Sequence, residues 1–410
     1  MSFGARVVVS LVAGLAFGAL LGALHHPSLN LIVPVLEPLG TLWLNALRMT
    51  VIPLVISMLI TGVASAAATA TTGRIGARAL ALFAVSLTAA ATLAALFTPV
   101  ILAWWPVDPK AAAAFRASVS HAAPLIVQPP ALRDFIVNLV PANPFKAAAD
   151  GDLLPLVMFA LLFGFAAARI APALRAPLLS FFQAVMETLF VIVQWVLRAA
   201  PIGVFALTLA VGMRGGVGAA GVLGHYLIMM CAIGVAITLL VYPAVVLLGR
   251  VSLTRFVQAV APAQAVAIST QSSLASLPTM IEAAQTGLGV SEQVTSITLP
   301  LAVSLFRLTS PLFNLALVIF VAHVYGVHLG ASQLAVGVLM AVVTNLSVAG
   351  LPGQSSLLNT TVPISLAMGV PLDLLPLLVA IEVVPDIFRT LGNVTADVAA
   401  TVIVARLAKS

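Results

Sequence analysis

Residues 374–408 read LLPLLVAIEVVPDIFRTLGNVTADVAATVIVARLA, an apolar run that five polar residues interrupt. The five are Glu382, Asp386, Arg389, Asn393 and Asp397, and the last four follow the first by 4, 7, 11 and 15 positions. At about 100° per residue they share a helix stripe roughly 80° wide. Charges at membrane depth are costly and usually face a protein interior or a wet cavity on a substrate or ion path. We therefore predict a functional site on this face; the alternative is an ion network that only joins helices.

The composition is that of an integral membrane protein. Of the 410 residues, 62% are hydrophobic and 7% charged, and the mean hydropathy is +1.19; soluble domains carry about 25% charged residues. The net charge of +6 comes from scattered Lys and Arg residues, without the basic runs that nucleic-acid binding needs. The single cysteine, Cys231, excludes a disulfide framework and a cysteine-based metal site.

Eight apolar segments are candidates for membrane spans. They cover residues 5–24, 38–66, 76–105, 152–170, 174–211, 218–248, 293–325 and 373–408. Basic residues in short loops set the orientation, because they stay in the cytoplasm. With both termini inside, only Arg214 falls in a short external loop, and nine basic residues are cytoplasmic. These nine are Arg6, Arg74, Arg78, Arg169, Arg175, Arg250, Arg255, Arg406 and Lys409.

Two further apolar segments, 255–288 and 333–370, have polar, helix-breaking centres. The first contains AISTQSSLASLPTM (267–280), and the second contains TNLSVAGLPGQSSLLNTT (344–361). Irregular backbone is tolerated at membrane depth only inside protein or beside a cavity. We predict two re-entrant hairpins that enter from opposite sides, although two kinked spans would also fit the pattern. Hairpin plus helix occurs twice in opposite orientation, as in transporters with inverted repeats.

The chain resembles the dicarboxylate/amino acid:cation symporters, which include the glutamate and aspartate transporters. DIFRTLGNVTAD (386–397) is similar to the family's last-helix pattern D-x-x-R-T-x-x-N-V-x-G-D, with Ala396 in place of the glycine. The other resembling motifs run nearly from end to end. They are MTVIPLV (49–55), VPANPFKA (140–147), APIGVFAL (200–207), QSSLASLP (271–278) and AGLPG (349–353).

The resemblance implies an all-α homotrimer in which each protomer has eight transmembrane segments and two re-entrant helical hairpins. Residues 1–75 and 152–211 would form a scaffold for trimerisation. Residues 76–105 and 218–410 would form a transport part that slides against the scaffold. Residues 106–151 would be an external connection. The location would be the plasma membrane, or the inner membrane in a bacterium.

By resemblance, Arg389 holds the substrate's side-chain carboxylate and Asp386 its ammonium group. The chemistry agrees, because a guanidinium is a planar fork for carboxylates. A structural ion pair between Asp386 and Arg389 is the alternative. Exposed N–H groups of the hairpin tips are expected to hold the α-carboxylate. The full predicted substrate site is Arg389, Asp386, Thr390, Asn393, Ser272, Ser273, Ser310, Leu351, Pro352 and Gly353.

The seventh segment departs from the family pattern. Where the family has Asn-Met-Asp-Gly-Thr, with sodium ligands, this chain reads Phe306-Arg307-Leu308-Thr309-Ser310. In the third segment, Ala79, Leu82 and Phe83 stand where the family places further sodium ligands. We predict that this deep sodium site is absent and that Arg307 supplies fixed positive charge beside Asp397. Glu382 is the candidate proton carrier, because burial favours the neutral form of a carboxyl group.

The predicted function is symport of acidic amino acids such as glutamate and aspartate, by elevator-type alternating access. Coupling to protons, or reduced coupling to sodium, is expected, with Asp397 and Asn393 as the candidate sodium ligands and no other cofactor. The alternatives are a sodium-coupled C4-dicarboxylate carrier and a binding-only membrane protein that has lost coupling. An enzyme is disfavoured, because Asp386 and Asp397 lie about 16 Å apart along one helix and an acid–base pair needs close approach.

Overall fold

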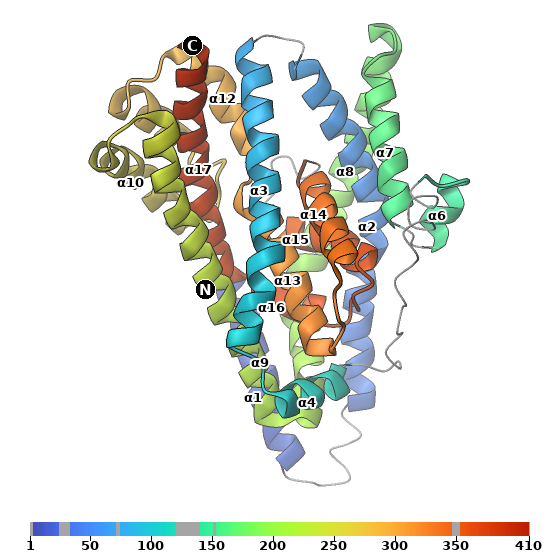
Figure 1. The fold of residues 1–410 in the computed structure, drawn as a ribbon. Helices are drawn as coiled ribbons and strands as arrows, with labels where there is room; N and C mark the ends of the chain where they lie inside the picture. The colour runs from blue at the N-terminus through green and yellow to red at the C-terminus, as the bar shows by residue number, and fades with distance from the viewer. Residues whose placement is uncertain are drawn as a thin grey trace.

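The computed structural model describes residues 3–23, 33–70, 74–119, 140–150, 153–346 and 353–409, and these residues contain helices but no strand (Figure 1). The helices up to residue 244 are α1 (Phe3–Ala23), α2 (Val33–Ala70), α3 (Arg74–Trp104), α4 (Pro109–Val119), α6 (Pro144–Asp150), α7 (Leu153–Ala167), α8 (Pro172–Arg198) and α9 (Ala200–Ala244). The later ones are η2 (Val245–Gly249), α10 (Leu253–Thr270), α11 (Leu277–Glu282), η3 (Ala283–Gly287), α12 (Glu292–Leu305), α13 (Thr309–Tyr325), α14 (Ala331–Leu346), α15 (Gly353–Ala367), α16 (Leu375–Ile381) and α17 (Val383–Lys409).

Within the described ranges, five helical stretches are long and apolar enough to cross a membrane. They are Ile75–Trp104, Pro172–Val196, Ala220–Gly249, Glu292–Tyr325 and Val383–Ala408. Shorter apolar helices cover Val9–Gly22, Ile52–Ala64, Met158–Ala167, Pro201–Met213 and Ala331–Asn345. Each of the eight segments predicted from the sequence overlaps at least one of these stretches, so the prediction of an all-α polytopic membrane protein is confirmed.

The loop predicted over residues 212–217, with Arg214 in it, is wrong. Helix α9 continues through these residues, and the chain turns instead at Ala199, between α8 and α9. Pro201 explains this position, because a proline has no N–H group and is tolerated in the first turn of a helix. The glycines at 215 and 216 lower helix stability by about 1 kcal/mol each but keep their N–H groups.

Two of the predicted membrane segments are each interrupted by a short break. Residues 306–308 separate α12 from α13, and Glu382 separates α16 from α17, so residues 374–408 do not form the single helix that their periodicity predicted. Pro311 and Pro385 lie in the first turns of α13 and α17. Each proline leaves the carbonyl four positions earlier without its helical donor, which permits the break.

Both predicted hairpins contain a pair of contacting helices. In the first, α10 contacts α11 and η3, and residues 271–276 form the turn between them. In the second, α14 contacts α15. The tip motif of the second hairpin lies outside the described residues except for Gly353, which begins α15.

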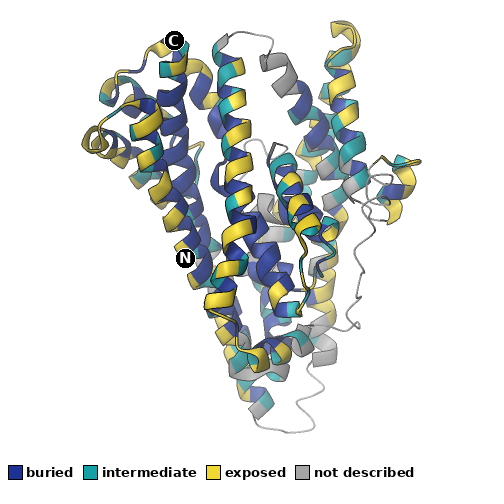
Figure 2. Cartoon of the chain, in the orientation of Figure 1, coloured by how far each residue is buried: buried dark blue, intermediate teal, exposed yellow. Residues whose placement is uncertain are grey.

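The helices pack in two groups. In the first, α2 contacts α7, α8 and α9, and α1 lies along α9. In the second, α17 contacts α3, α10, α12 and α13, and α13 and α17 are the most deeply buried helices (Figure 2). Helix α4, within the predicted external connection, packs on α9 and α13, and Arg116 Nη1 donates to the Val324 carbonyl at 2.9 Å.

A glycine seam joins α1 to α9. Gly14, Gly18 and Gly22 are spaced four residues apart on α1. A methyl group added to Gly18 would lie 2.3 Å from the Leu209 carbonyl oxygen, and one added to Gly212 would lie 2.5 Å from the Leu15 carbonyl oxygen. Small residues allow such close approach of helix backbones within a membrane, where packing rather than hydrophobicity holds helices together.

Candidate functional site

The polar face of α16–α17 lies inside the protein. Glu382, Arg389, Asn393 and Asp397 are each 1% exposed, and Asp386 is 3% exposed. Thr390, at the edge of the stripe, is also buried. The 3.6-residue period therefore identified a face that is turned away from lipid.

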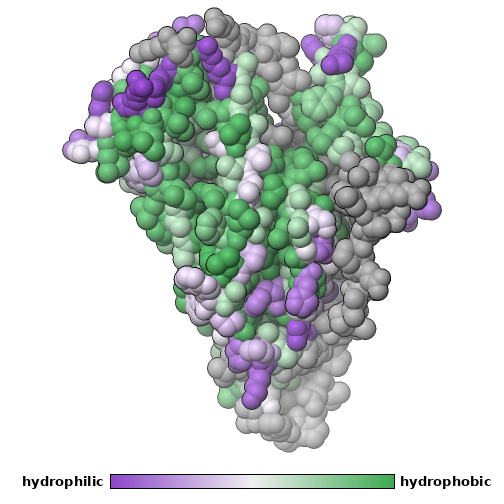
Figure 3. Space-filling model, in the orientation of Figure 1, coloured by the Kyte–Doolittle hydropathy of each residue, from purple (hydrophilic) through white to green (hydrophobic). Residues whose placement is uncertain are grey.

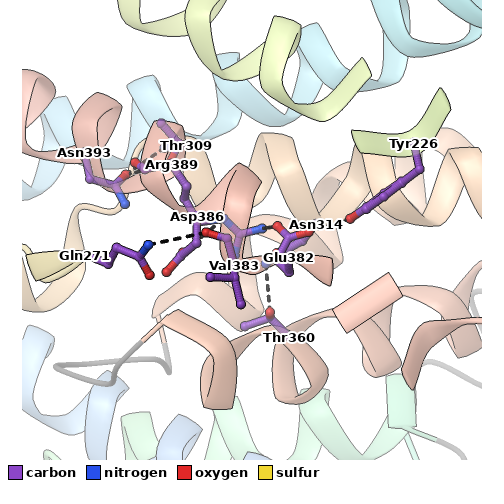
Figure 4. Close-up of polar contacts among 10 residues, drawn as sticks. All are labelled: Tyr226, Gln271, Thr309, Asn314, Thr360, Glu382, Val383, Asp386, Arg389 and Asn393. Carbon is purple, nitrogen blue, oxygen red and sulfur yellow. Dashed lines mark hydrogen bonds and ion pairs between the residues drawn. The ribbon is translucent and has the colours of Figure 1, made fainter. Parts of the chain in front are cut away.

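Glu382 and Arg389 form the shortest ion pair of this face. Arg389 Nη2 donates to Glu382 Oε1 at 2.7 Å, and Tyr226 of α9 donates its hydroxyl to Glu382 Oε2 at 2.6 Å (Figure 4). The guanidinium also stacks over the ring of Phe313 on α13, 4.9 Å from its centroid. Helices α9 and α13 thus hold the arginine and the glutamate in place.

Asp386 is much less engaged. Its Oδ1 lies 4.0 Å from Arg389 Nε, and both atoms lack a hydrogen-bond partner among the described residues. The alternative prediction was a structural ion pair between these two residues. They form only a long contact, because the guanidinium donates its hydrogen bond to Glu382 instead. A buried carboxylate oxygen without a hydrogen-bond donor is energetically costly, so a cationic or N–H group of a ligand would stabilise it.

Asn393 connects α17 to the first turn of α13. Its Oδ1 accepts the Thr309 backbone N–H at 3.0 Å and lies 2.8 Å from the Thr309 hydroxyl. That hydroxyl is also 3.0 Å from the Arg389 carbonyl. The amide nitrogen of Asn393 has no partner among the described residues. Asn393 therefore offers donors to a ligand, whereas its oxygen is already used.

Arg307 lies at the break between α12 and α13 and is 9% exposed. It is within electrostatic reach of Asp386 and Asp397. Both carboxylate oxygens of Asp397 lack hydrogen bonds to described residues. Beside the break, Phe306 stacks on Phe83 of α3, with ring centroids 4.5 Å apart and 11° between the planes. Two of the positions predicted to have lost sodium ligands thus form an apolar contact.

The tip of the first hairpin reaches the start of α17. Gln271 Nε2 lies 3.4 Å from the Val383 carbonyl (Figure 4). Ser272 and Ser273 follow it and are half-buried, and Ser272 Oγ accepts the Ala275 N–H at 3.2 Å. The predicted serines are therefore near the polar face, although their hydroxyls do not contact Asp386 or Arg389.

The second hairpin approaches through α15. Asn314 Nδ2 of α13 donates to Thr360 Oγ1 at 2.8 Å, on the side of Glu382 that faces α15 (Figure 4). Of the predicted tip residues, Leu351 and Pro352 lie outside the described residues. Ser310, also predicted, is buried in the first turn of α13.

The sequence analysis missed four contributors to this site, namely Tyr226, Gln271, Thr309 and Phe313. A signal existed for Tyr226, because it is one of only three tyrosines and lies in the centre of an apolar run. The contacts themselves are long-range and leave no local pattern.

The site has a charge imbalance. Two arginines, Arg307 and Arg389, face three carboxylates, so the fully ionised cluster has a net charge of −1 (2 − 3). No group of three or more His, Cys, Asp or Glu side chains that could hold a metal ion occurs among the described residues.

The sequence model of the sodium:dicarboxylate symporter family matches residues 3–407. The chain belongs to this family, and hence to a class of membrane transporters rather than enzymes.

The names of curated relatives refer to glutamate or aspartate in some cases and to C4-dicarboxylates in others. A proton/glutamate-aspartate symporter of Escherichia coli (strain K12) is 29% identical over 404 residues, which cover 98% of this chain and 92% of the relative. A proton/sodium-glutamate symport protein of Geobacillus stearothermophilus is 28% identical over 96% of this chain and 92% of its own. A C4-dicarboxylate transport protein of Azorhizobium caulinodans is 25% identical over 98% of this chain and 89% of its own.

Proposed function

We propose that this protein is a symporter of acidic amino acids such as glutamate and aspartate, which works by elevator-type alternating access. The observation that carries the proposal is the buried guanidinium of Arg389 beside the unpaired carboxylate oxygen of Asp386. An acidic amino acid has one ammonium and two carboxylate groups, and this pair complements both kinds of charge.

In this proposal, the substrate's side-chain carboxylate binds Arg389 and its ammonium binds Asp386. The free amide of Asn393 and the hydroxyls of Thr390 and Ser310 add hydrogen bonds. The tips of the two hairpins, at Ser272, Ser273 and 351–353, hold the α-carboxylate through backbone N–H groups. The contact between Gln271 and the start of α17 supports the first of these tips.

Proton coupling follows from the contact between Glu382 and Arg389. The ionised glutamate occupies Arg389 Nη2 at 2.7 Å and competes with a substrate carboxylate for the guanidinium. Protonation of Glu382 removes the competing charge and frees the arginine. An acidic amino acid carries a net charge of −1, so one proton on Glu382 also restores the charge that the empty site had.

Sodium coupling is reduced in this proposal. The oxygen of Asn393 is engaged by Thr309, and Arg307 lies within electrostatic reach of Asp397. Phe83 stacks on Phe306, so aromatic carbon atoms occupy positions where a sodium site would need oxygen ligands. Asp397 remains the candidate if a sodium site survives.

The proposed architecture is a homotrimer with eight transmembrane segments and two re-entrant hairpins per protomer. Packing of α2 on α7 and α8 supports the scaffold, residues 1–75 and 152–211, and packing around α17 supports the transport part, residues 76–105 and 218–410. The continuous helix α9 joins the two parts. None of the described residues in the apolar window of α8 is buried within the protomer, which leaves this helix for contact with a partner subunit or lipid.

The placement of the C-terminus in the cytoplasm has support from the fold. The start of α3, the end of α7 and the end of α17 lie at the same end of the molecule (Figure 1). This end carries most of the basic residues of the short loops, as expected for a cytoplasmic face.

The second candidate is a sodium-coupled C4-dicarboxylate carrier, and the names of some relatives support the C4-dicarboxylate part of it. Asp386 argues against it, because a buried carboxylate beside the substrate repels a dicarboxylate that has no ammonium group. A protein that binds without transport is the third reading.

The test is uptake of labelled aspartate, glutamate and succinate into proteoliposomes under separate proton and sodium gradients. We expect aspartate or glutamate to accumulate with the proton gradient, and Asp386→Asn to reduce their uptake more than that of succinate. Preferred uptake of succinate with sodium would establish the dicarboxylate carrier. Saturable binding without accumulation would establish the binding-only protein.

A further inference from the structure

A cavity lies beyond the polar face of α17, at the end of the molecule that holds the C-terminus. Its volume is about 580 Å³, within the usual range of about 300–1,000 Å³ for ligand pockets. It lies between the start of α3, the ends of η2 and α17, and the residues that precede α12. Hydrophilic residues gather at this end above a broad apolar belt (Figure 3).

The lining of this cavity is strongly basic. It contains Arg78, Arg250 and Arg406, and no acidic residue is among the lining residues. Glu292 is in the first turn of α12 but is exposed and does not line the cavity. Three guanidinium groups without a carboxylate create a positive potential that favours an anion.

The arginines keep donors for a ligand. Arg406 Nη1 donates to the Leu248 carbonyl at 2.6 Å, and Arg78 Nη1 donates to the Leu407 carbonyl. These bonds fix the two side chains but use one nitrogen of each guanidinium, which has five N–H groups in total. Arg250 forms no hydrogen bond or ion pair with the described residues. A phosphate can accept pairs of hydrogen bonds from such groups.

Helix α12 adds neutral donors. It begins at Glu292, and its N-cap residue Ser291, which lines the cavity, has no side-chain capping bond. The first N–H groups of a helix lack partners within it and attract anions. The cavity thus combines fixed positive charge with free donors of two kinds.

We propose that this cavity binds a phosphate group, carried by an anionic phospholipid at the cytoplasmic surface or by a soluble phosphate. Basic pockets between membrane helices on the cytoplasmic side suit lipid headgroups. The bound phosphate ties together the ends of α3, η2, α12 and α17, and therefore stiffens the group of helices that carries Arg389. The proposal concerns binding at a second site and does not depend on which substrate the protein transports.

The test uses the full-length protein in nanodiscs of phosphatidylcholine, to which phosphatidylglycerol or inorganic phosphate is added. The thermal unfolding midpoint and native mass spectrometry report binding. Arg250→Gln removes one lining charge without breaking a hydrogen bond to a described residue. Arg169→Gln is the matched control, because Arg169 is exposed in the turn between α7 and α8 and does not line the cavity.

We expect saturable stabilisation of the wild type and about tenfold weaker binding by Arg250→Gln, as for loss of one charge-assisted hydrogen bond. Arg169→Gln should bind like the wild type. Retention of phosphatidylglycerol identifies a lipid site, and stabilisation by phosphate alone identifies a soluble ligand. The proposal is overturned if neither ligand binds saturably, or if both variants lose affinity equally, since that would indicate diffuse surface attraction.

Discussion

Replacement of Glu382 by glutamine should uncouple substrate affinity from pH. In the wild type, Glu382 and Arg389 are 2.7 Å apart and each is 1% exposed, so the ionised glutamate competes directly with a substrate carboxylate. Glutamine keeps the shape of the side chain but carries no charge at any pH. The variant therefore mimics the protonated, binding-competent site.

The size of the effect follows from proton linkage. If one proton on Glu382 accompanies each substrate, affinity falls about tenfold, or 1.36 kcal/mol, for each pH unit above the titration of this carboxyl. Over two pH units the wild-type Kd for aspartate should rise about 100-fold. The Kd of Glu382→Gln should stay constant and be lower than that of the wild type at high pH.

Isothermal titration calorimetry of the purified protein between pH 5 and 9 measures both slopes. Glu187→Gln is the matched control, because Glu187 is an exposed carboxyl on membrane helix α8, away from the site. This control should keep the wild-type slope. A wild-type Kd that does not change with pH, or an equally steep slope in Glu382→Gln, would refute the competition between Glu382 and substrate.

Three other substitutions test other contacts. Arg307→Gln should lower the free energy of unfolding by about 3–5 kcal/mol, because it leaves a buried charge uncompensated. The double variant with Asp397→Asn should regain the wild-type thermal midpoint. An unchanged midpoint in the single variant would mean that the two groups are not paired. Thr309→Val should cost about 1–2 kcal/mol in chemical denaturation through loss of its hydroxyl hydrogen bond, and a neutral result would remove the contact from the account. Gly18→Ala should lower the thermal midpoint by an amount equivalent to about 1–3 kcal/mol, because the added methyl meets a backbone oxygen 2.3 Å away. The matched variant Gly221→Ala should keep the wild-type midpoint, because nothing lies within 4 Å of its added methyl.

Local periodicity was sufficient to predict the buried face of α17. Five polar residues at helical spacing in an apolar run can avoid lipid in only one orientation, and all five are buried. The two interrupted segments were found for a similar reason, since Ser, Gly and Pro clusters cannot continue an exposed membrane helix. Both contain helix pairs in the structure.

Other features depend on tertiary contacts that local patterns do not contain. Tyr226 and Glu382 are 156 positions apart, and nothing near Tyr226 indicates that its hydroxyl binds this carboxyl. The continuous course of α9 through a glycine-rich segment is also absent from the local pattern, because the weak helix propensity of glycine predicts a break there. The break at Glu382 was visible in principle, as Pro385 removes the N–H group that would bond to Ile381.

Binding of labelled aspartate to two variants that both lack the Glu382 carboxylate tests the substrate site most directly. Glu382→Gln alone leaves Arg389 free, whereas Glu382→Gln combined with Arg389→Ala removes one charge of each sign and leaves no carboxylate at position 382. We predict that the single variant binds aspartate and that the double variant, folded by its thermal midpoint, shows no binding at about 100 times the single variant's Kd. Equal affinity of the two variants would contradict the assignment of Arg389 to the substrate.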